Sequence, residues 1–439
     1  MSNLIDRALS IVKDIPELDS YELISETKHG WEFYFIKNRL DQNRVVDEET
    51  VTAKLYVRTE DADGKANLGS ASGKLSPTLS DEEIRIKLMD VKYRAGLVKN
   101  PYYTLTSVKP QVDLKLSRAE VSAVAGDFIR AMKELPADEF TDVNSFEVFA
   151  SLITRKTINS NGVSYECTYP SSVLDLVVNA REKSVADGRG REIELYRILT
   201  SGTCDGESLK ETITQLFSFG RDRLKAELTP KTKVDTVILS TQDATELYNY
   251  FLMQMNASYK YRKISAYEKG VSIAVDRTGD KINLKALSSL KNSGADFPVD
   301  EEGAEIKERY LIENDIPKSF WGSRQFMSYL GEEESGIVRN VSVDGGSSSK
   351  EELRSGDYIE VVEFSDFQVD PMSGDIVGEI RLGYLHEGGT VKIVTGGSVS
   401  GSVSEVLPSL KFSRETKQYD TMVIPEVTRM EDMRITGVV

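Results

Sequence analysis

Few residues of this chain carry the side chains that metal or nucleophilic chemistry usually requires. There are only two histidines, His29 and His386, and two cysteines, Cys167 and Cys204. His386-Glu387 runs directly into two glycines, which would break the helix that an HExxH zinc motif needs. A Ser-His-Asp triad would have to use one of the two histidines, and the sequence has no Gly-x-Ser-x-Gly elbow to position its serine. The sequence therefore argues against a histidine-based zinc site and against a serine hydrolase.

The remaining reactive residues are expected to be structural. His29 lies in the segment Lys-His-Gly, which is typical of a solvated turn between two strands. Cys167 and Cys204 have no CxxC spacing and fall in or beside predicted strands or turns, so we expect small buried residues rather than thiolate nucleophiles. The glycine-rich segments lack the Lys-Ser/Thr ending of a phosphate-binding loop and are interpreted as turns. Among 71 acidic residues, chance pairs of carboxylates are inevitable, and no catalytic pair is predicted.

Length and composition limit the class of protein. A chain of 439 residues usually forms two domains, and its formal net charge of −16 argues against direct binding of nucleic acid, which requires concentrated Lys and Arg. No segment is apolar over the roughly 18 residues that a membrane helix needs. The start of the chain has acidic residues among its apolar ones and is predicted to be a helix rather than a signal peptide. With two cysteines and no export signal, the expected location is cytoplasmic.

The elements that would position a site centre on residues 234–256. A short β-branched run at 234–239 predicts a strand, and Ser240 followed by Asp243 fits a capping box that would start a helix. The apolar residues at 244–255 then recur at the spacing of one helical face. A helix N-terminus directly after a strand is a frequent place for chemistry, because its free N–H groups favour negative charge. The simpler alternative is a packing unit without chemistry.

The other predicted elements divide the chain into two parts. Residues 1–230 predict a mixed α/β domain, with a sub-boundary near 108, a connector at 102–110 and a last helix that ends before Pro230. Its predicted helices span 4–12, 80–95, 117–135 and 207–228, and its predicted strands span 21–24, 31–36, 44–46, 51–57, 146–158, 163–169, 173–180 and 193–200. Residues 231–439 predict a β-rich domain, with short strands at 271–275, 310–312, 338–343, 358–364, 380–385, 391–394 and 422–424. The predicted fold class is α+β with two domains.

Three segments, in shared order, resemble the TldD/PmbA family, described as a metalloprotease system and as modulators of DNA gyrase. Val369–Asp375, which reads VDPMSGD, and the later Gly383-Tyr384 with Gly388 are similar to the family's NPxTGDxS and GFxxExG segments. Glu308–Asn314, which reads ERYLIEN, is similar to its LIExG segment. Asn161–Val163, with the strands after it and the helix before Thr229, resembles the second part of its N-terminal half. The resemblance spans residues 21–423 and implies a mixed α/β first half and a β-rich second half.

The resemblance also implies where a metal would bind. The TldD side of the family binds a metal through HExxxH on the helix after the central strand and through a cysteine near the C-terminus. Thr245, Glu246 and Tyr250 occupy the motif positions, so both histidines are replaced, and the region of the cysteine, residues 416–419, has none. A lone carboxylate does not hold zinc tightly. The three positions are therefore predicted to be vestigial, with Glu246 an exposed helix residue, no catalytic or metal residue and no cofactor.

The resemblance is closest to the PmbA side of the family, also called TldE. It implies a non-catalytic subunit that pairs with a TldD-like metalloprotease subunit and acts on unstructured peptides. A stand-alone protein that binds peptides without cutting them, either as a monomer or as a homodimer, is the alternative. A hydrolase with a site of different composition is disfavoured because the usual nucleophile-base pairs are missing. Neither nucleic acid nor a membrane is an expected partner.

Overall fold

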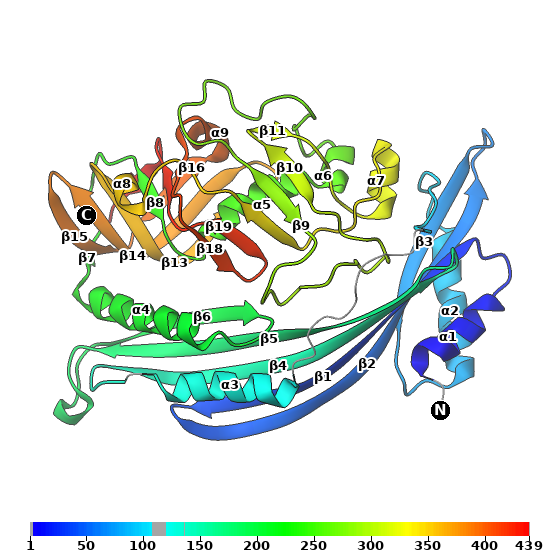
Figure 1. Cartoon of the computed structure of the whole chain (residues 1–439), viewed down its shortest axis with the longest axis horizontal. Coiled ribbons are helices and arrows are strands. Elements are labelled where there is room, and N and C mark those ends of the chain that lie inside the picture. The colour runs from blue at the N-terminus through cyan, green and yellow to red at the C-terminus, as the bar shows by residue number, and fades with distance from the viewer. Residues whose placement is uncertain (1–2, 108–119, 136, 439) are drawn as a thin grey trace.

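The computed structural model describes residues 3–107, 120–135 and 137–438, and its α+β fold confirms the predicted class (Figure 1). The helices of the first half are α1 Leu4–Lys13, α2 Asp81–Gly96, α3 Val121–Lys133 and α4 Gly206–Lys225. Its strands are β1 Ser20–Ile36, β2 Arg39–Glu60, β3 Ala66–Leu75, β4 Thr141–Asn159, β5 Ser164–Arg181 and β6 Glu192–Ser201. The predicted sub-boundary near 108, part of the predicted connector and the predicted start of α3 at 117 lie outside the described residues.

The first half is one long antiparallel sheet in the order β3-β2-β1-β4-β5-β6. In Figure 1 the sheet is long and curved, with α1 and α2 at one end and α3 and α4 at the other. Alternate residues of each strand face these helices, as the period of a strand requires. Leu23 packs in the core with α1 and α2, whereas Phe35, Phe146 and Leu176 pack in the core with α3 and α4. The helices therefore cover two separate cores along the length of the sheet.

Three predicted interruptions of this sheet are wrong, and one is the gap between the predicted strands at 44–46 and 51–57, because β2 is continuous from Arg39 to Glu60. The predicted turn at His29 lies within β1, where His29 pairs with Asp47 and its side chain is exposed. Gly30 is needed there for packing, because a Cβ would lie 2.9 Å from the carbonyl oxygen of Ala150. The predicted break at Pro170 is also absent, since β5 continues through it. Strand β6 ends opposite Ser172, so β5 has a free edge at Pro170 and needs no N–H there.

The second half contains two further sheets and shorter helices. Its strands are β7 Glu227–Leu228, β8 Val237–Leu239, β9 Leu284–Leu287, β10 Arg309–Glu313, β11 Ile316–Pro317, β12 Asn340–Val343, β13 Tyr358–Val369, β14 Asp375–Glu387, β15 Thr390–Thr395, β16 Ser398–Ser402, β17 Lys411–Phe412, β18 Thr416–Tyr419, β19 Met422–Pro425, β20 Thr428–Met430 and β21 Arg434–Thr436. Its helices are α5 Ala244–Gln254, α6 Ala257–Tyr261, α7 Arg324–Leu330, α8 Lys350–Leu353 and α9 Val403–Val406. The predicted strand at 271–275 is not formed, because Val271 and Val275 are exposed and no described strand pairs with them.

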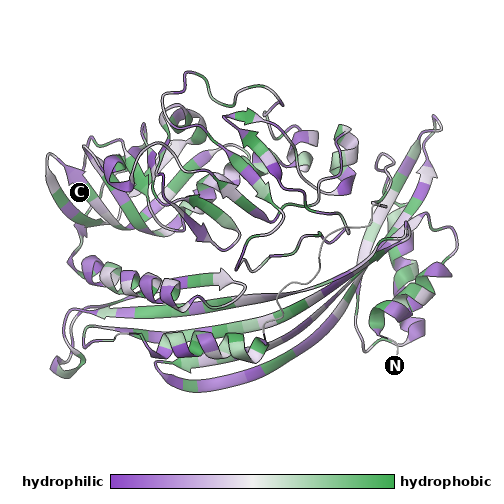
Figure 2. Ribbon diagram, viewed as in Figure 1, coloured by the Kyte–Doolittle hydropathy of each residue, from purple (hydrophilic) through white to green (hydrophobic). Residues whose placement is uncertain are grey.

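The two sheets of the second half share one large core around α5. One sheet has the order β17-β20-β8-β13-β14-β15-β7, with β16 and β21 branching from β14, and the other has the order β11-β10-β9-β12-β19-β18. Strand β8 is buried between β13 and β20, and Leu247 and Phe251 of α5 are fully buried in the same core. Green apolar and purple polar residues alternate along these strands in Figure 2. The predicted strand and helix at 234–256 are thus central to the second half.

The two halves are joined through the sheet rather than by a free linker. Strand β7 precedes residue 230 but pairs with β15. Thr229 is fully buried, and its N–H and hydroxyl both donate to the carbonyl of Thr395. By sheet membership the division therefore falls just before β7, a few residues ahead of the predicted boundary. No helix in the described part of the chain is long and apolar enough to cross a membrane.

Candidate functional site

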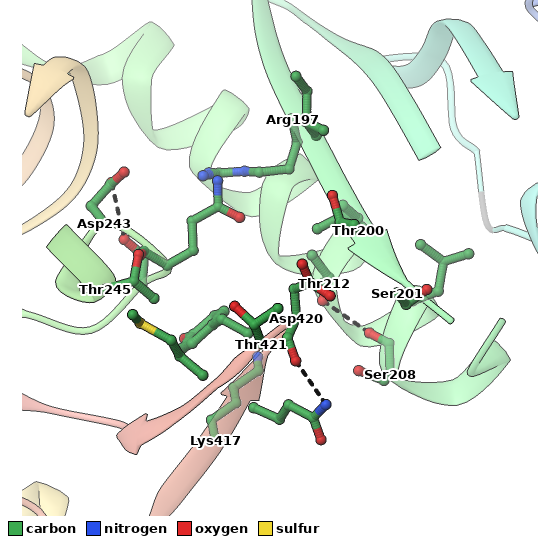
Figure 3. A pocket seen from close by; sticks show the side chains of 18 of the residues that line it. Arg197, Thr200, Ser201, Ser208, Thr212, Asp243, Thr245, Lys417, Asp420 and Thr421 are labelled. Carbon is green, nitrogen blue, oxygen red and sulfur yellow. Dashed lines mark hydrogen bonds between the residues drawn. The ribbon is translucent and has the colours of Figure 1, made fainter. Parts of the chain in front are cut away.

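A cavity of about 720 Å³ lies between the two halves of the molecule. The first half lines it with the end of β6, residues 197–201, and with one side of α4. The second half lines it with the turn and helix after β8 and with the β18–β19 hairpin. Figure 3 shows Arg197 and Thr200 of β6 on one side of the cavity, and Thr245, Lys417 and Asp420 on the other. Segments that are more than 200 residues apart in the sequence therefore form a single site.

Helix α5 supplies one wall because its apolar face is fixed by the core. Burial of Ala244, Leu247, Tyr248 and Phe251 turns the opposite face, with Thr245, Glu246 and Asn249, toward the cavity. The predicted capping box is wrong. Asp243 has helical backbone angles and makes no cap hydrogen bond, and the hydroxyl of Ser240 instead donates to Glu360 at 2.6 Å. A partner on β13, 120 residues away in the chain, competes successfully with the local cap.

The three positions of the metal motif do not converge. The Thr245 hydroxyl lines the cavity and donates to the carbonyl of Gln242 at 2.7 Å. Tyr250 does not line the cavity, and its ring packs against Phe251 and Tyr267 at centroid distances of 5.4 and 6.5 Å. Five residues along a helix are separated by roughly 140°, so Thr245 and Tyr250 face different directions. Asn249, four residues after Thr245, lies on the cavity side and was missed, although its spacing could have revealed it.

Glu246 was predicted to be an exposed helix residue, and this prediction is wrong. It is half-buried and lines the cavity. Burial raises the pKa of its carboxyl, and the nearby carboxyl of Asp243 raises it further. Burial also raises the pKa of Asp243, while Arg197 and the Thr241 hydroxyl oppose that rise. The two carboxyl groups therefore form an acidic wall at the start of α5.

The region where the family has a cysteine lies in the same cavity. Residues 416–419 form β18, and Lys417 and Tyr419 line the site. The cysteines of this chain lie elsewhere: Cys167 is buried within the sheet of the first half, and Cys204 is half-buried beside α3 and α4. Burial raises the pKa of both thiols, which disfavours thiolate. Two of the predicted motif positions, Thr245 and Glu246, and the predicted cysteine region thus belong to two walls of one cavity.

The donor set does not fit a zinc ion. A zinc site needs imidazole, thiolate or several carboxylate ligands that converge within about 2.3 Å of the metal. Across the described residues, no three His, Cys, Asp or Glu side chains are grouped so that they could hold a metal ion. At the motif positions, the Thr245 hydroxyl is engaged by a backbone carbonyl and Tyr250 faces the core. The side chains at the motif positions therefore do not form the ligand set of a zinc site among the described residues.

A buried ion pair at the inner side of the cavity was not predicted. Arg197 of β6 donates to Glu363 of β13, and both side chains are less than a tenth exposed. Burial raises the pKa of Glu363 to about 7, although the guanidinium of Arg197 holds it down. The alternation of Leu195, Arg197 and Leu199 places Arg197 on the covered face, and this pattern could have revealed it. The pair links the sheet of the first half to a sheet of the second.

Comparison with known proteins identifies the domain family of the second half. Residues 232–437 match the model of the PmbA/TldA metallopeptidase C-terminal domain. A metalloprotease TldD homologue from Buchnera aphidicola is 27% identical over 175 residues, which are 35% of this chain and 36% of the relative's length. The matched part therefore spans about a third of that relative.

Solved structures share the fold of the whole chain. TldE from Thermococcus kodakarensis superposes with a TM-score of 0.74 at 18% identity and 99% coverage of both chains. A structure from Thermotoga maritima, described as a candidate modulator of DNA gyrase, superposes with a TM-score of 0.75 at 15% identity, with 99% of this chain and 98% of that chain covered. Residues 232–437 therefore form a domain of the PmbA/TldA metallopeptidase C-terminal family, and the whole chain shares the fold of these solved structures.

Proposed function

We propose that this chain is a TldE/PmbA-like subunit without its own catalytic metal, which works with a TldD-like metalloprotease subunit on unfolded peptides. One observation carries the proposal. A cavity beside the positions of the family's metal motif is lined by both halves, but Thr245, Glu246 and Tyr250 do not form a metal site. A binding cavity without metal ligands is what a non-catalytic partner of a metalloprotease requires.

Two strand edges at the cavity support binding of an extended peptide. Strand β6 is the last strand of the first sheet and β18 is the last strand of another, so in the described structure each has an edge that pairs with no other strand. Residues of both strands line the cavity. A strand edge captures an extended peptide through main-chain hydrogen bonds, whatever the side chains of the peptide are. This mode suits a substrate that has no folded structure.

A stand-alone peptide-binding protein, as a monomer or a homodimer, is the second candidate. It is favoured by the fact that one chain supplies all the described walls of the cavity, including both strand edges. Binding of a peptide would then need no other subunit, and no cleavage would follow.

Reconstitution distinguishes the two candidates. An unfolded peptide is incubated with this chain, with a TldD-like partner, and with the two together, and fragments are measured with and without a chelator. The first candidate predicts chelator-sensitive cleavage that is faster with the pair than with the partner alone. It also predicts co-elution of the two chains in gel filtration. Peptide binding by this chain, without co-elution and without any change in the partner's cleavage rate, would favour the second candidate.

A further inference from the structure

The outer edge of β2 is unpaired over its first part. Strand β3 pairs only with the second part of β2, from Val51 to Glu60, and no other described strand pairs with that edge. At the other end Asp41 forms a bulge, because Leu40 and Gln42 pair with consecutive residues of β1. The regular free edge of β2 is therefore residues 42–50.

This free edge is accessible and has little protection against strand pairing. All of its residues are exposed except Val46 and Glu49, which are partly exposed. Native sheets protect their edges with proline, lysine, bulges or a covering segment, because unpaired N–H and C=O groups pair readily with another strand. Residues 42–50 contain neither proline nor lysine, and their only protection is a set of charged side chains. The arrangement of these charges therefore decides which strand can pair here.

The charges on the free edge are complementary to themselves. When residues 42–50 pair antiparallel with the same residues of a second copy, a two-fold axis passes Val46, and Arg44 of each copy lies opposite Glu48 of the other. Arg44 and Glu48 are an even number of residues apart, so both lie on one face of the sheet. Like charges are opposed nowhere in this register. It is also the register in which the whole free edge is paired.

Neighbouring registers are less favourable. An axis at Val45 separates Arg44 from Glu48 and brings Asp41 opposite Glu49, whereas an axis at Asp47 places that carboxylate opposite itself. Like charges directly opposite one another destabilise a strand pair. The sequence of the free edge therefore favours a second copy in one register, centred on Val46.

We propose that two copies of this chain associate by antiparallel pairing of β2 with β2 across a two-fold axis at Val46, so that one sheet continues through both subunits. The inference goes beyond the proposed function and does not depend on it. The sheet order places β2 and β6 on opposite sides of β1, and only β6 contributes to the cavity. In Figure 1 the hairpin of β1 and β2 lies along the lower margin of the molecule. Pairing at β2 therefore leaves the cavity free for a peptide.

Cysteine cross-linking of the full chain tests the register. In a background with Cys204→Ser, Val46→Cys places the thiols of the two copies directly opposite each other, where Cα atoms are about 4.5–5.5 Å apart and a disulfide can form. Asn43→Cys is the matched control, because Asn43 is exposed on the same edge but would lie roughly 20 Å from its counterpart. Under mild oxidation the first variant should give at least tenfold more cross-linked dimer than the second on a non-reducing gel.

Sedimentation over a range of protein concentrations gives the dissociation constant of the dimer. Glu48→Arg opposes two arginines at each end of the pairing and should raise that constant by about tenfold or more. Glu379→Arg makes the same change of charge at an exposed residue outside this edge, and it should leave the constant unchanged.

A wild-type chain that stays monomeric at every concentration overturns the proposal, and the proposed function is then still decided by the reconstitution assay. A dimer whose Val46→Cys variant cross-links no better than Asn43→Cys also overturns it, because another surface would then join the copies. If Val46→Cys does not fold, the dissociation constant decides: no difference between Glu48→Arg and Glu379→Arg overturns the pairing, and a selective loss with Glu48→Arg supports it.

Discussion

Arg197 and Glu363 form a buried ion pair between the two halves. Both are buried, and their ion pair joins β6 of the first half to β13 of the second. Removing one partner of a buried pair leaves an uncompensated charge, so Arg197→Met should lower the free energy of unfolding by about 3–5 kcal/mol. The double variant Arg197→Met with Glu363→Gln should lose clearly less. Urea denaturation measures both.

The control for this prediction is an exposed pair. Arg130 and Asp127 of α3 contact at 2.9 Å, with side chains 67% and 50% exposed. Arg130→Ala should change stability by no more than about 0.5 kcal/mol, because exposed pairs are solvated in both states. Equal losses for Arg197→Met and Arg130→Ala would show that burial does not govern the junction.

Glu302 makes stability depend on pH. It is 8% exposed, and burial raises the pKa of its carboxyl, as do the nearby carboxylates of Glu22 and Asp300, although Lys54 at 4.0 Å opposes this. A raised pKa means that the folded state holds a proton that the unfolded state has already released. The contribution of this carboxyl group to the free energy of unfolding is therefore fully present below the unfolded pKa of about 4.3. It is lost as the pH rises through the folded pKa.

The measurement is the melting temperature across neutral pH. We expect it to fall as the pH is raised from weakly acidic to weakly alkaline values, and we expect Glu302→Gln to flatten that slope. Glu379→Gln, which removes an exposed carboxylate, is the matched control and should leave the slope unchanged. A wild-type protein that becomes more stable over this range would contradict the assignment.

At the scale of elements, the free edges of β6 and β18 determine how a peptide can be held. Backbone N–H groups of an extended peptide point alternately to its two sides, and one strand edge pairs with only one side. N-methylation of every second residue should therefore weaken binding at least tenfold for one alternate set, since each lost hydrogen bond costs about 0.5–1.5 kcal/mol. The other set should have little effect.

Isothermal titration with the two methylated peptides and the parent peptide measures this difference. Weakening by both sets would indicate that the peptide lies between the two edges and pairs with each. If neither set weakens binding, main-chain pairing is not the mode of recognition, and side-chain contacts within the cavity would have to account for the affinity.

At the scale of the whole molecule, the donor set of the cavity predicts the metal content. The purified chain should hold no stoichiometric zinc, because neither imidazole nor thiolate reaches the site among the described residues. Elemental analysis before and after addition of a TldD-like partner checks this. About one tightly held zinc per chain, removed only by a chelator, would contradict it.

The rate of peptide hydrolysis provides a functional test of the same prediction. A neutral unfolded peptide should be cut only when the TldD-like partner is present, and Glu246→Ala in this chain should leave that rate largely unchanged, since a glutamate promotes hydrolysis only beside a metal-bound water. The matched experiment uses each subunit alone and the pair with and without the substitution. Chelator-sensitive cleavage by this chain alone, abolished by Glu246→Ala, would reveal an active metal site.

Local patterns in the sequence determined the elements that depend on neighbours a few residues away. The predicted helix at 80–95 forms as α2, which begins at a capping box of Ser80 and Glu83, and the apolar periodicity of 4–12 gives the buried face of α1. The strand and helix at 234–256 are also formed, because a β-branched run and a helical face are properties of the segment itself. That Thr245 and Tyr250 stand where the family motif has histidines was also evident from the sequence.

Only the tertiary structure decided the features that depend on distant partners. Gly30 and Pro170 suggest breaks in isolation, but the neighbouring strands extend β1 and β5 through them. Ser240 fits a cap, yet Glu360 of another strand binds its hydroxyl. The cavity itself joins β6, α5 and β18, whose proximity has no local signal. Periodicity and capping are encoded within one or two turns, whereas the partner of a hydroxyl or a carboxylate depends on how the sheets pack.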